Sequence, residues 1–188
     1  MKVQGIFKKC AAAALAGCSL LLLSPTVDAK MQFPTGNAGY AFGDTCTVRV
    51  TDGSTITFER TGAASFTVNG VPYYGDTEGK PYDRLEMVVQ RGRDDVTGDM
   101  VFLVTFADVH IGTVSDGWLF AKMHDGTFHD IIVNDSWCTQ PYEVRMETPK
   151  SGKTDTFYVT YRNHANPYKT RGIAVWWDKS LNRWNYHA

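Results

Sequence analysis

Short runs in which apolar and polar residues alternate recur along this chain about every 8 to 14 residues, separated by Gly, Asp, Asn and Pro. Alternation with a period of two is typical of β-strands that bury one face, and no segment keeps a helical period for more than about two turns. The pattern predicts strands over residues 45–51, 54–60, 64–69, 84–91, 100–111, 117–124, 127–134, 142–148, 155–162, 171–177 and 183–187. It therefore predicts an all-β fold, an antiparallel β-sandwich or a closed β-barrel of about nine to eleven strands.

One predicted strand differs from the others because it is apolar on both faces. Residues 100–111 read MVFLVTFADVHI, which is typical of a central strand covered on both sides. By contrast, the sequences YEVRMET at 142–148 and TFYVTYR at 156–162 predict a hairpin with one solvated face. The segments 30–44 and 70–83 are rich in Gly and Pro and are predicted to be loops.

The hairpin around the sequence TDGS has a register that the apolar pattern predicts. A three-residue loop with Gly53 in the left-handed region pairs Val48 with Ile56 and Cys46 with Phe58. This register gathers the apolar side chains on one face, whereas a two-residue loop would mix apolar and polar residues on both faces.

A second hairpin is predicted from the sequence KMHDGTFHD at residues 122–130. A two-residue Asp-Gly turn there would pair Lys122 with His129 and place His124 and His129 on the same face as diagonal neighbours. Asp130 would fall on the opposite face, so it is not predicted to be a simple partner of His129.

The two histidines of this hairpin are weak candidates for a metal site. A catalytic zinc usually has three protein ligands, and His110 on the preceding predicted strand is the candidate for the third, beside His124 and His129. The alternative is that these histidines are solvated polar residues near a turn. No motif for an organic cofactor is present, so no cofactor is predicted.

The N-terminal segment has the features of a secretory signal peptide. Three lysines precede an apolar run over residues 10–23, and a small-residue cleavage pattern follows at 27–29. The run is short for a helix that crosses a bilayer, and no second run of that kind follows, so no transmembrane helix is predicted. We expect residues 1–29 to be removed and the protein to be secreted or periplasmic.

The sequence LAGC, which ends at Cys18, gives an alternative because it resembles the lipobox of bacterial lipoproteins. In that case residues 1–17 would be removed, Cys18 would carry a lipid anchor, and the protein would be a membrane-anchored lipoprotein. The apolar run continues beyond Cys18, which favours cleavage after Ala29. Both alternatives indicate a bacterial cell envelope.

Removal of residues 1–29 from the 188-residue chain leaves 30–188, which is predicted to form a single all-β domain. The removed part holds three lysines and Asp28, so the formal net charge changes from −1 to −3. The charges are interspersed and no basic stripe is visible, so nucleic acid is not an expected partner.

Two cysteines remain after the predicted cleavage, Cys46 and Cys138. In an exported protein such a pair is most simply a disulfide, with two buried free thiols as the alternative. The spacing of the two residues does not favour a metal site, because there is no C-x-x-C pair.

Aromatic residues near the C-terminus are the remaining candidates for a binding surface. Trp176 and Trp177 are consecutive, so in a strand they point to opposite faces, and Trp184 and Tyr186 share a face. Flat rings beside hydrogen-bonding groups suit a carbohydrate or protein surface, whereas the alternative is that the rings fill the core. Trp176, Trp184 and Tyr186 are the predicted binding residues.

The sequence therefore predicts an exported, non-catalytic binding or structural module of a bacterial envelope, with carbohydrate or another envelope protein as its possible partner. The alternative is a small secreted metal-dependent or hydrolytic enzyme centred on His110, His124 and His129. The motifs G-x-S-x-G and H-E-x-x-H are both absent, which favours the non-catalytic interpretation without deciding it.

Overall fold

The computed structural model describes residues 31–34, 36–75, 85–108, 112–113, 117–133, 141–148, 156–163 and 166–187. The elements of this part are β1 (Met31–Gln32), η1 (Gly36–Gly39), β2 (Tyr40–Phe42), β3 (Thr45–Arg49), β4 (Thr55–Arg60), β5 (Ser65–Val68), β6 (Val71–Tyr74), β7 (Glu86–Asp94), β8 (Met100–Asp108), β9 (Gly112–Thr113), β10 (Trp118–Lys122), β11 (Phe128–Ile132), β12 (Pro141–Glu147), β13 (Thr156–Asn163), β14 (Asn166–Asp178) and β15 (Arg183–His187). Each predicted strand overlaps an observed one. Within these ranges, no helix has the length and apolar character needed to span a membrane. The predicted signal peptide and Cys18 lie outside the described residues.

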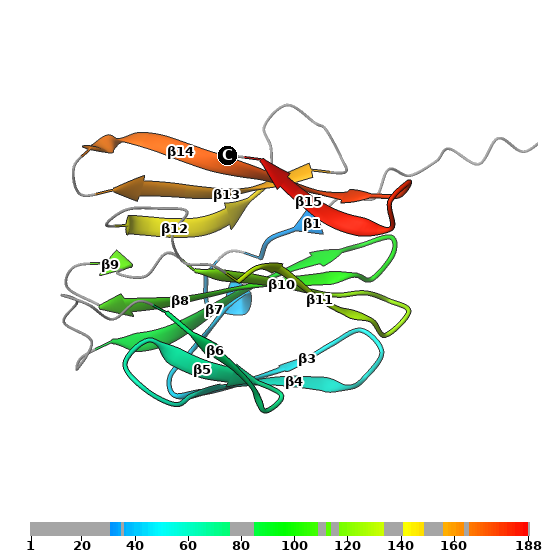
Figure 1. The fold of residues 1–188 in the computed structure, drawn as a ribbon, viewed down its shortest axis with the longest axis horizontal. Helices are drawn as coiled ribbons and strands as arrows, with labels where there is room; N and C mark the ends of the chain where they lie inside the picture. Colours follow the sequence, from blue (N-terminus) through cyan, green and yellow to red (C-terminus); the bar gives the residue numbers. More distant parts are fainter. Residues whose placement is uncertain are drawn as a thin grey trace, which may run out of the picture.

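The strands form three antiparallel sheets that lie in layers (Figure 1). The central sheet has the order β1-β7-β8-β10-β11, with β2 paired to β7 and β9 paired to β8. The β3–β6 sheet lies on one side of it, and the β12–β15 sheet lies on the other. The predicted all-β class is confirmed. The structure has neither of the two predicted architectures in simple form, because there is a third sheet and the described strands do not close into a barrel.

The third layer follows from strand β8, whose two faces are both apolar as predicted. Its alternate residues Phe102 and Val104 lie in the core shared with the β3–β6 sheet, whereas Val101 and Leu103 lie in the core shared with the β12–β15 sheet. All four side chains are at most 2% exposed. A strand with two apolar faces is stable only when a layer covers each face, because each large buried side chain contributes roughly 1.5–3 kcal/mol.

The β3–β4 hairpin has the predicted register. Val48 pairs with Ile56 and Cys46 pairs with Phe58. Gly53 has a φ of 85°, which is the left-handed conformation that the three-residue loop requires. The prediction from the apolar pattern is therefore confirmed at this hairpin.

The β10–β11 hairpin differs from its prediction. The loop has three residues, and Lys122 pairs with Phe128 rather than with His129. The reason is local, because Asp125 accepts hydrogen bonds from the backbone N and the Oγ1 of Thr127, at 2.9 and 2.7 Å, which stabilises the longer loop. The predicted two-residue turn is therefore wrong.

The predicted loop over 30–44 contains β1, η1 and β2, and the predicted loop over 70–83 contains β6. The strands β1 and β2 both pair with β7, at Arg93–Asp94 and at Val88–Gln90. These elements are too short for a period of two to be visible in sequence, and their partner strands stabilise them. The two loop predictions are wrong at these strands.

Cys46 is a free, buried thiol that faces the core shared by the central and β3–β6 sheets. Its Sγ donates to the carbonyl oxygen of Gly43 at 3.7 Å, and burial raises the pKa of the thiol. The predicted disulfide is not seen, and Cys46 packs among apolar side chains of the core. Its predicted partner Cys138 lies outside the described residues.

The amide of Gln90 joins the central sheet to the β12–β15 sheet. Gln90 is 5% exposed, accepts a hydrogen bond from the backbone N of Met146 at 2.6 Å and donates one to the Met146 carbonyl oxygen at 3.1 Å. A side-chain amide carries both a donor and an acceptor. It can therefore make the two hydrogen bonds to one residue of β12 that the backbone of a neighbouring strand would otherwise make. This pair satisfies polar groups inside the interface between the two layers.

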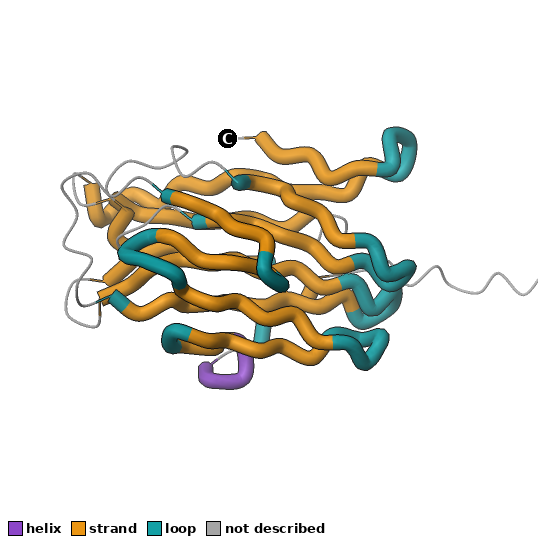
Figure 2. The backbone as a smooth tube through the Cα atoms, turned by 60° about the horizontal axis from the view of Figure 1, so that its bottom comes forward, coloured by secondary structure: helices purple, strands orange, loops and turns teal. Residues whose placement is uncertain are grey.

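Hairpin loops gather at one end of the molecule. The loops that follow β3, β7, β10 and β14 all lie there (Figure 1 and Figure 2). Thr51 Oγ1 donates to the Gly98 carbonyl oxygen at 2.7 Å, and the backbone N of His124 donates to Asp99 at 2.7 Å. The turn between β7 and β8 is thus held from both sides.

Candidate functional site

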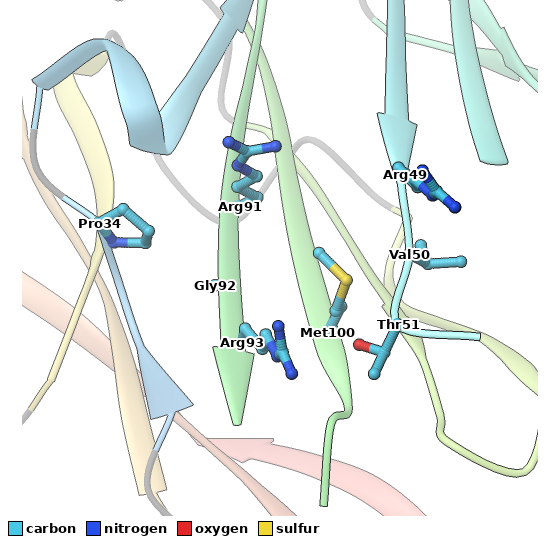
Figure 3. Close-up of a pocket in the computed structure, with 8 residues that line it drawn as sticks. All are labelled: Pro34, Arg49, Val50, Thr51, Arg91, Gly92, Arg93 and Met100. Atoms are coloured by element: carbon cyan, nitrogen blue, oxygen red, sulfur yellow. The ribbon is translucent and has the colours of Figure 1, made fainter. Parts of the chain in front are cut away.

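A pocket of about 460 Å³ lies between β7 of the central sheet and β3 of the β3–β6 sheet. Three arginines from these two strands contribute to its wall, and we call it the arginine pocket (Figure 3). Its lining residues are Pro34, Arg49, Val50, Thr51, Arg91, Gly92, Arg93 and Met100. A volume of this size is in the range of small-molecule sites, about 300–1,000 Å³.

Strand alternation explains why two of the arginines share one wall. Met87 and Val89 of β7 point into the core beneath the β3–β6 sheet, and Arg91 and Arg93 continue the same face further along the strand. Beyond the core this face borders the pocket. The arginines therefore stand where β7 passes the end of β3.

Gly92, between these arginines, faces the opposite side of the central sheet. A Cβ at this position would lie 2.3 Å from Cε1 of Phe33, whose ring packs on Phe157 with centroids 5.6 Å apart. Only glycine permits this close approach. The sequence Arg-Gly-Arg thus combines two arginines on one face with a tight packing contact on the other.

Arg91 is fixed in place by the backbone. Its Nε and Nη2 both donate to the carbonyl oxygen of Ala38, at 2.9 and 2.6 Å, which leaves the Nη1 group for another acceptor. Arg49 and Arg93 are exposed. None of the ion pairs found between described residues includes Arg49, Arg91 or Arg93.

The electrostatics of the arginine pocket favour an anion. No acidic side chain is among the described residues that line it. The whole chain has a formal net charge of −1, so the three guanidinium groups are a local excess of positive charge. Arg91 and Arg93 project from the same face of β7, whereas Arg49 is on the exposed face of β3 and its side chain points away from β7 (Figure 3).

The two described histidines of the predicted set, His124 and His129, contact different residues. His124 Nδ1 lies 2.8 Å from Asp99 Oδ1, whereas His129 Nε2 lies 3.2 Å from Thr127 Oγ1 and its ring contacts Trp177. His110 lies outside the described residues. Over the described ranges, no group of three or more His, Cys, Asp or Glu side chains could hold a metal ion.

Asp130 faces the other side of the hairpin from His129, as predicted. Its Oδ1 accepts a hydrogen bond from the hydroxyl of Tyr73 at 2.9 Å, which joins β11 to β6. Burial and then this hydrogen bond raise the pKa of Tyr73 to about 12. The hydroxyl therefore stays protonated at neutral pH and acts as a donor between two sheets.

The stability of the fold should depend on pH through His124. The hydrogen bond to Asp99 and the Asp99 charge raise the pKa of His124 in the folded state. The stabilisation is fully present below the ordinary histidine pKa of about 6.5 and is lost as the pH rises through the raised folded-state pKa.

We therefore expect the midpoint of urea unfolding to fall more in the wild type than in a His124→Gln variant between about pH 5.5 and 8.5. A His187→Gln variant, changed at the exposed end of β15, is the matched control and should follow the wild type. Equal slopes in the wild type and in His124→Gln would contradict this prediction.

The predicted aromatic residues lie on both faces of the β12–β15 sheet. Trp177 and Trp184 pack against the core shared with the central sheet, with ring centroids 5.5 Å apart. Trp176 lies on the outer face of the sheet, so the two consecutive tryptophans point to opposite faces as predicted. Tyr186 shares the face of Trp184 and is 53% exposed. Trp176, Trp184 and Tyr186 therefore do not form one flat surface.

The three arginines of the pocket are absent from the sequence predictions. The sequence QRGRD could have indicated part of this pocket. Arg91 and Arg93 are two positions apart at the end of a predicted strand, so their side chains share one face. Arg49 is separated from them by more than forty positions along the chain, so only the packing of two sheets brings it to the same pocket.

No protein family, curated protein or solved structure matches the chain. The functional assignment therefore rests on the geometry of the site.

Proposed function

We propose that the protein is an exported, non-catalytic binding module of a bacterial cell envelope, and that it binds an anionic ligand in the arginine pocket. One observation carries this proposal: three arginines are among the lining residues of a single pocket, and among the described residues none of them has a carboxylate partner. Arginine is the side chain best suited to carboxylate and phosphate groups, because its planar fork donates two parallel hydrogen bonds.

The composition of the pocket supports binding rather than chemistry. Thr51 has the only hydroxyl among the described lining residues, and it already donates to the carbonyl oxygen of Gly98. The described lining residues include no histidine, carboxylate or thiol to act as a general base. Arginine stays protonated at neutral pH, so its role is to hold charge and to orient a ligand.

The export part of the proposal is supported by the apolar N-terminal segment and the cleavage pattern at 27–29. The sequence predicts carbohydrate or another envelope protein as partner, and the arginine pocket narrows this to a partner that carries negative charge. The half-buried Trp176 and the exposed Tyr186 remain predicted contacts, on separate faces of the β12–β15 sheet.

Thermal unfolding of the exported protein tests the proposal. We expect sulfate, phosphate or citrate to raise the Tm above its value in chloride at equal ionic strength. An anion at ten times its Kd stabilises the folded state by about 1.4 kcal/mol, or about 3–6 °C for a domain of this size. The Arg91→Gln/Arg93→Gln double variant should lose this rise.

Arg171→Gln is the matched control, because Arg171 is an exposed arginine on β14, away from the pocket. This control variant should keep the rise. An equal Tm in all four salts for the wild type would refute anion binding. A rise that persists in full in the double variant would refute binding in the arginine pocket, because sulfate and phosphate also stabilise folded proteins by exclusion from their surface.

A further inference from the structure

A second site lies on the other face of the central sheet, at the edge of the β12–β15 sheet. We infer that the free edge of β12 binds an extended segment of a partner protein. This segment pairs with the backbone of Val144 and places one large apolar side chain in the pocket beside it. The site goes beyond the proposed anion binding, because Arg91 and Arg93 project from the opposite face of β7.

The backbone of β12 has an edge that no other strand covers. β12 pairs with β13 on one side, and no strand among the described residues pairs with it on the other. The two hydrogen bonds between Gln90 and Met146 show that the N–H and C=O of Met146 point to this free edge. Backbone groups alternate in direction along an antiparallel strand, so the N–H and C=O of Val144, two residues earlier, point the same way. Gln90 thus fills one position of the edge and leaves the next one open.

A mainly apolar pocket of about 210 Å³ lies beside this open position. Its apolar lining residues are Phe42, Val88, Leu103, Ala107 and Val144. The volume is larger than the cavity of about 150 Å³ that holds a benzene molecule, so one Leu, Met or Phe side chain fits. A residue paired with Val144 has its side chain on the same face of the sheet as Val144, which is the face that borders the pocket. Backbone pairing and side-chain insertion are therefore compatible at one position.

The central sheet extends beyond β12 on this side. β12 contacts β7 and β8, and β15 contacts β11, so the free edge of β12 is directed toward β2 (Figure 1). Phe42 of β2 is 54% exposed, and its cross-strand partner Val88 is only half-buried. A strand added beside β12 would cover these two side chains and remove their apolar surface from water.

The extension of the central sheet favours a single strand over a second copy of this chain. Two copies that joined their β12 edges around a two-fold axis would bring both β2 strands into the same space, because neighbouring strands are only about 4.8 Å apart. An extended segment has no second layer and avoids this clash. Glu143 and Arg145, which flank Val144 on the outer face, already form an ion pair at 2.9 Å. The partner residues beside them are therefore expected to be uncharged, such as Thr or Ser.

Nuclear magnetic resonance of the isotope-labelled exported protein tests the inference with a blocked pentapeptide, Thr-Thr-Leu-Thr-Thr. We expect this peptide to bind with a Kd below about 1 mM, to shift the amide signal of Val144 and to slow the hydrogen exchange of that amide. The same peptide with N-methylleucine lacks one backbone donor, and Thr-Thr-Ala-Thr-Thr lacks the large apolar side chain. Each of these two peptides should bind about tenfold or more weakly.

A variant of the protein tests the pocket itself. Phe42→Ala should weaken the leucine peptide by about tenfold, because Phe42 lines the pocket, and the exposure of its ring means that the fold should survive. Leu181→Ala is the matched control: Leu181 is 56% exposed and lies in the loop between β14 and β15, so this variant should bind the peptide like the wild type.

Three results would overturn the inference. The first is the absence of any shift of the Val144 amide at about 10 mM of the leucine peptide. The second is equal binding of the N-methylleucine peptide, which would show that the pocket takes an apolar group without strand pairing. The third is a Val144 shift that depends on protein concentration in the absence of peptide, which would identify a second copy as the occupant of the edge.

Discussion

Replacement of Phe66 by alanine is expected to lower the free energy of unfolding by about 3–5 kcal/mol. Phe66 is fully buried, and its ring is central to the aromatic core between the β3–β6 sheet and the central sheet. It contacts the rings of Tyr73, Phe106, Trp118 and Phe120, with centroids 5.5, 6.2, 5.1 and 6.2 Å away. Alanine would leave a cavity among rigid rings that cannot collapse to fill it.

Urea unfolding followed by circular dichroism measures this change. Natural domains are stable by only about 5–15 kcal/mol, so the variant should remain folded but with a much reduced midpoint. Phe42→Ala is the matched control, because Phe42 is 54% exposed and the same atoms are removed. We expect the control to change stability by about 0.5 kcal/mol or less. A loss below about 1 kcal/mol for Phe66→Ala would contradict the described core.

Much of the fold could be predicted because its main signal is local. The period of two marks strands such as β12 and β13, and the doubly apolar sequence of β8 identifies the central strand. The register of the β3–β4 hairpin was predictable because only one loop length puts Val48 and Ile56 on one face with Cys46 and Phe58.

The β10–β11 hairpin shows where such reasoning fails. Its apolar residues favour the two-residue loop, yet Phe120 pairs with Asp130 and Lys122 pairs with Phe128. The hydrogen bonds from Thr127 to the side chain of Asp125 stabilise the longer loop instead. Leu119 still pairs with Ile132 as the two-residue loop requires, because an irregularity after Leu119 absorbs the difference. The apolar pattern contained no signal for that irregularity.

The candidate site was less accessible to prediction than the fold. Histidines and tryptophans draw attention in a sequence because their chemistry is distinctive, whereas an arginine is usually a solvated surface residue. What distinguishes Arg49, Arg91 and Arg93 is that they line one pocket and have no carboxylate partner among the described residues, which depends on how two sheets pack. The positions of the strands in the sequence do not indicate how many sheets they form. The pocket between two of these sheets could therefore not be predicted either.

The same packing gives Gln90 a role that its polarity alone does not suggest. On the face of the central sheet opposite Arg91 and Arg93, it satisfies the backbone N and carbonyl oxygen of Met146 in β12. Gln90→Met keeps the length of the side chain and removes both hydrogen bonds. Because each buried polar group left unsatisfied costs about 1–3 kcal/mol, we expect a loss of about 2–5 kcal/mol.

Urea unfolding gives the size of this loss, and amide hydrogen exchange locates it. Protection of the Met146 amide should fall in Gln90→Met, because its hydrogen-bond acceptor is gone. Gln32→Met is the matched control: Gln32 is exposed on β1, so the same substitution should change stability by about 0.5 kcal/mol or less. If Gln90→Met is as stable as the wild type and the Met146 amide keeps its protection, the two sheets are held together by their apolar side chains alone. A large loss with exchange confined to Met146 and its neighbours in β12 would instead establish the Gln90 amide as the polar joint between the two layers.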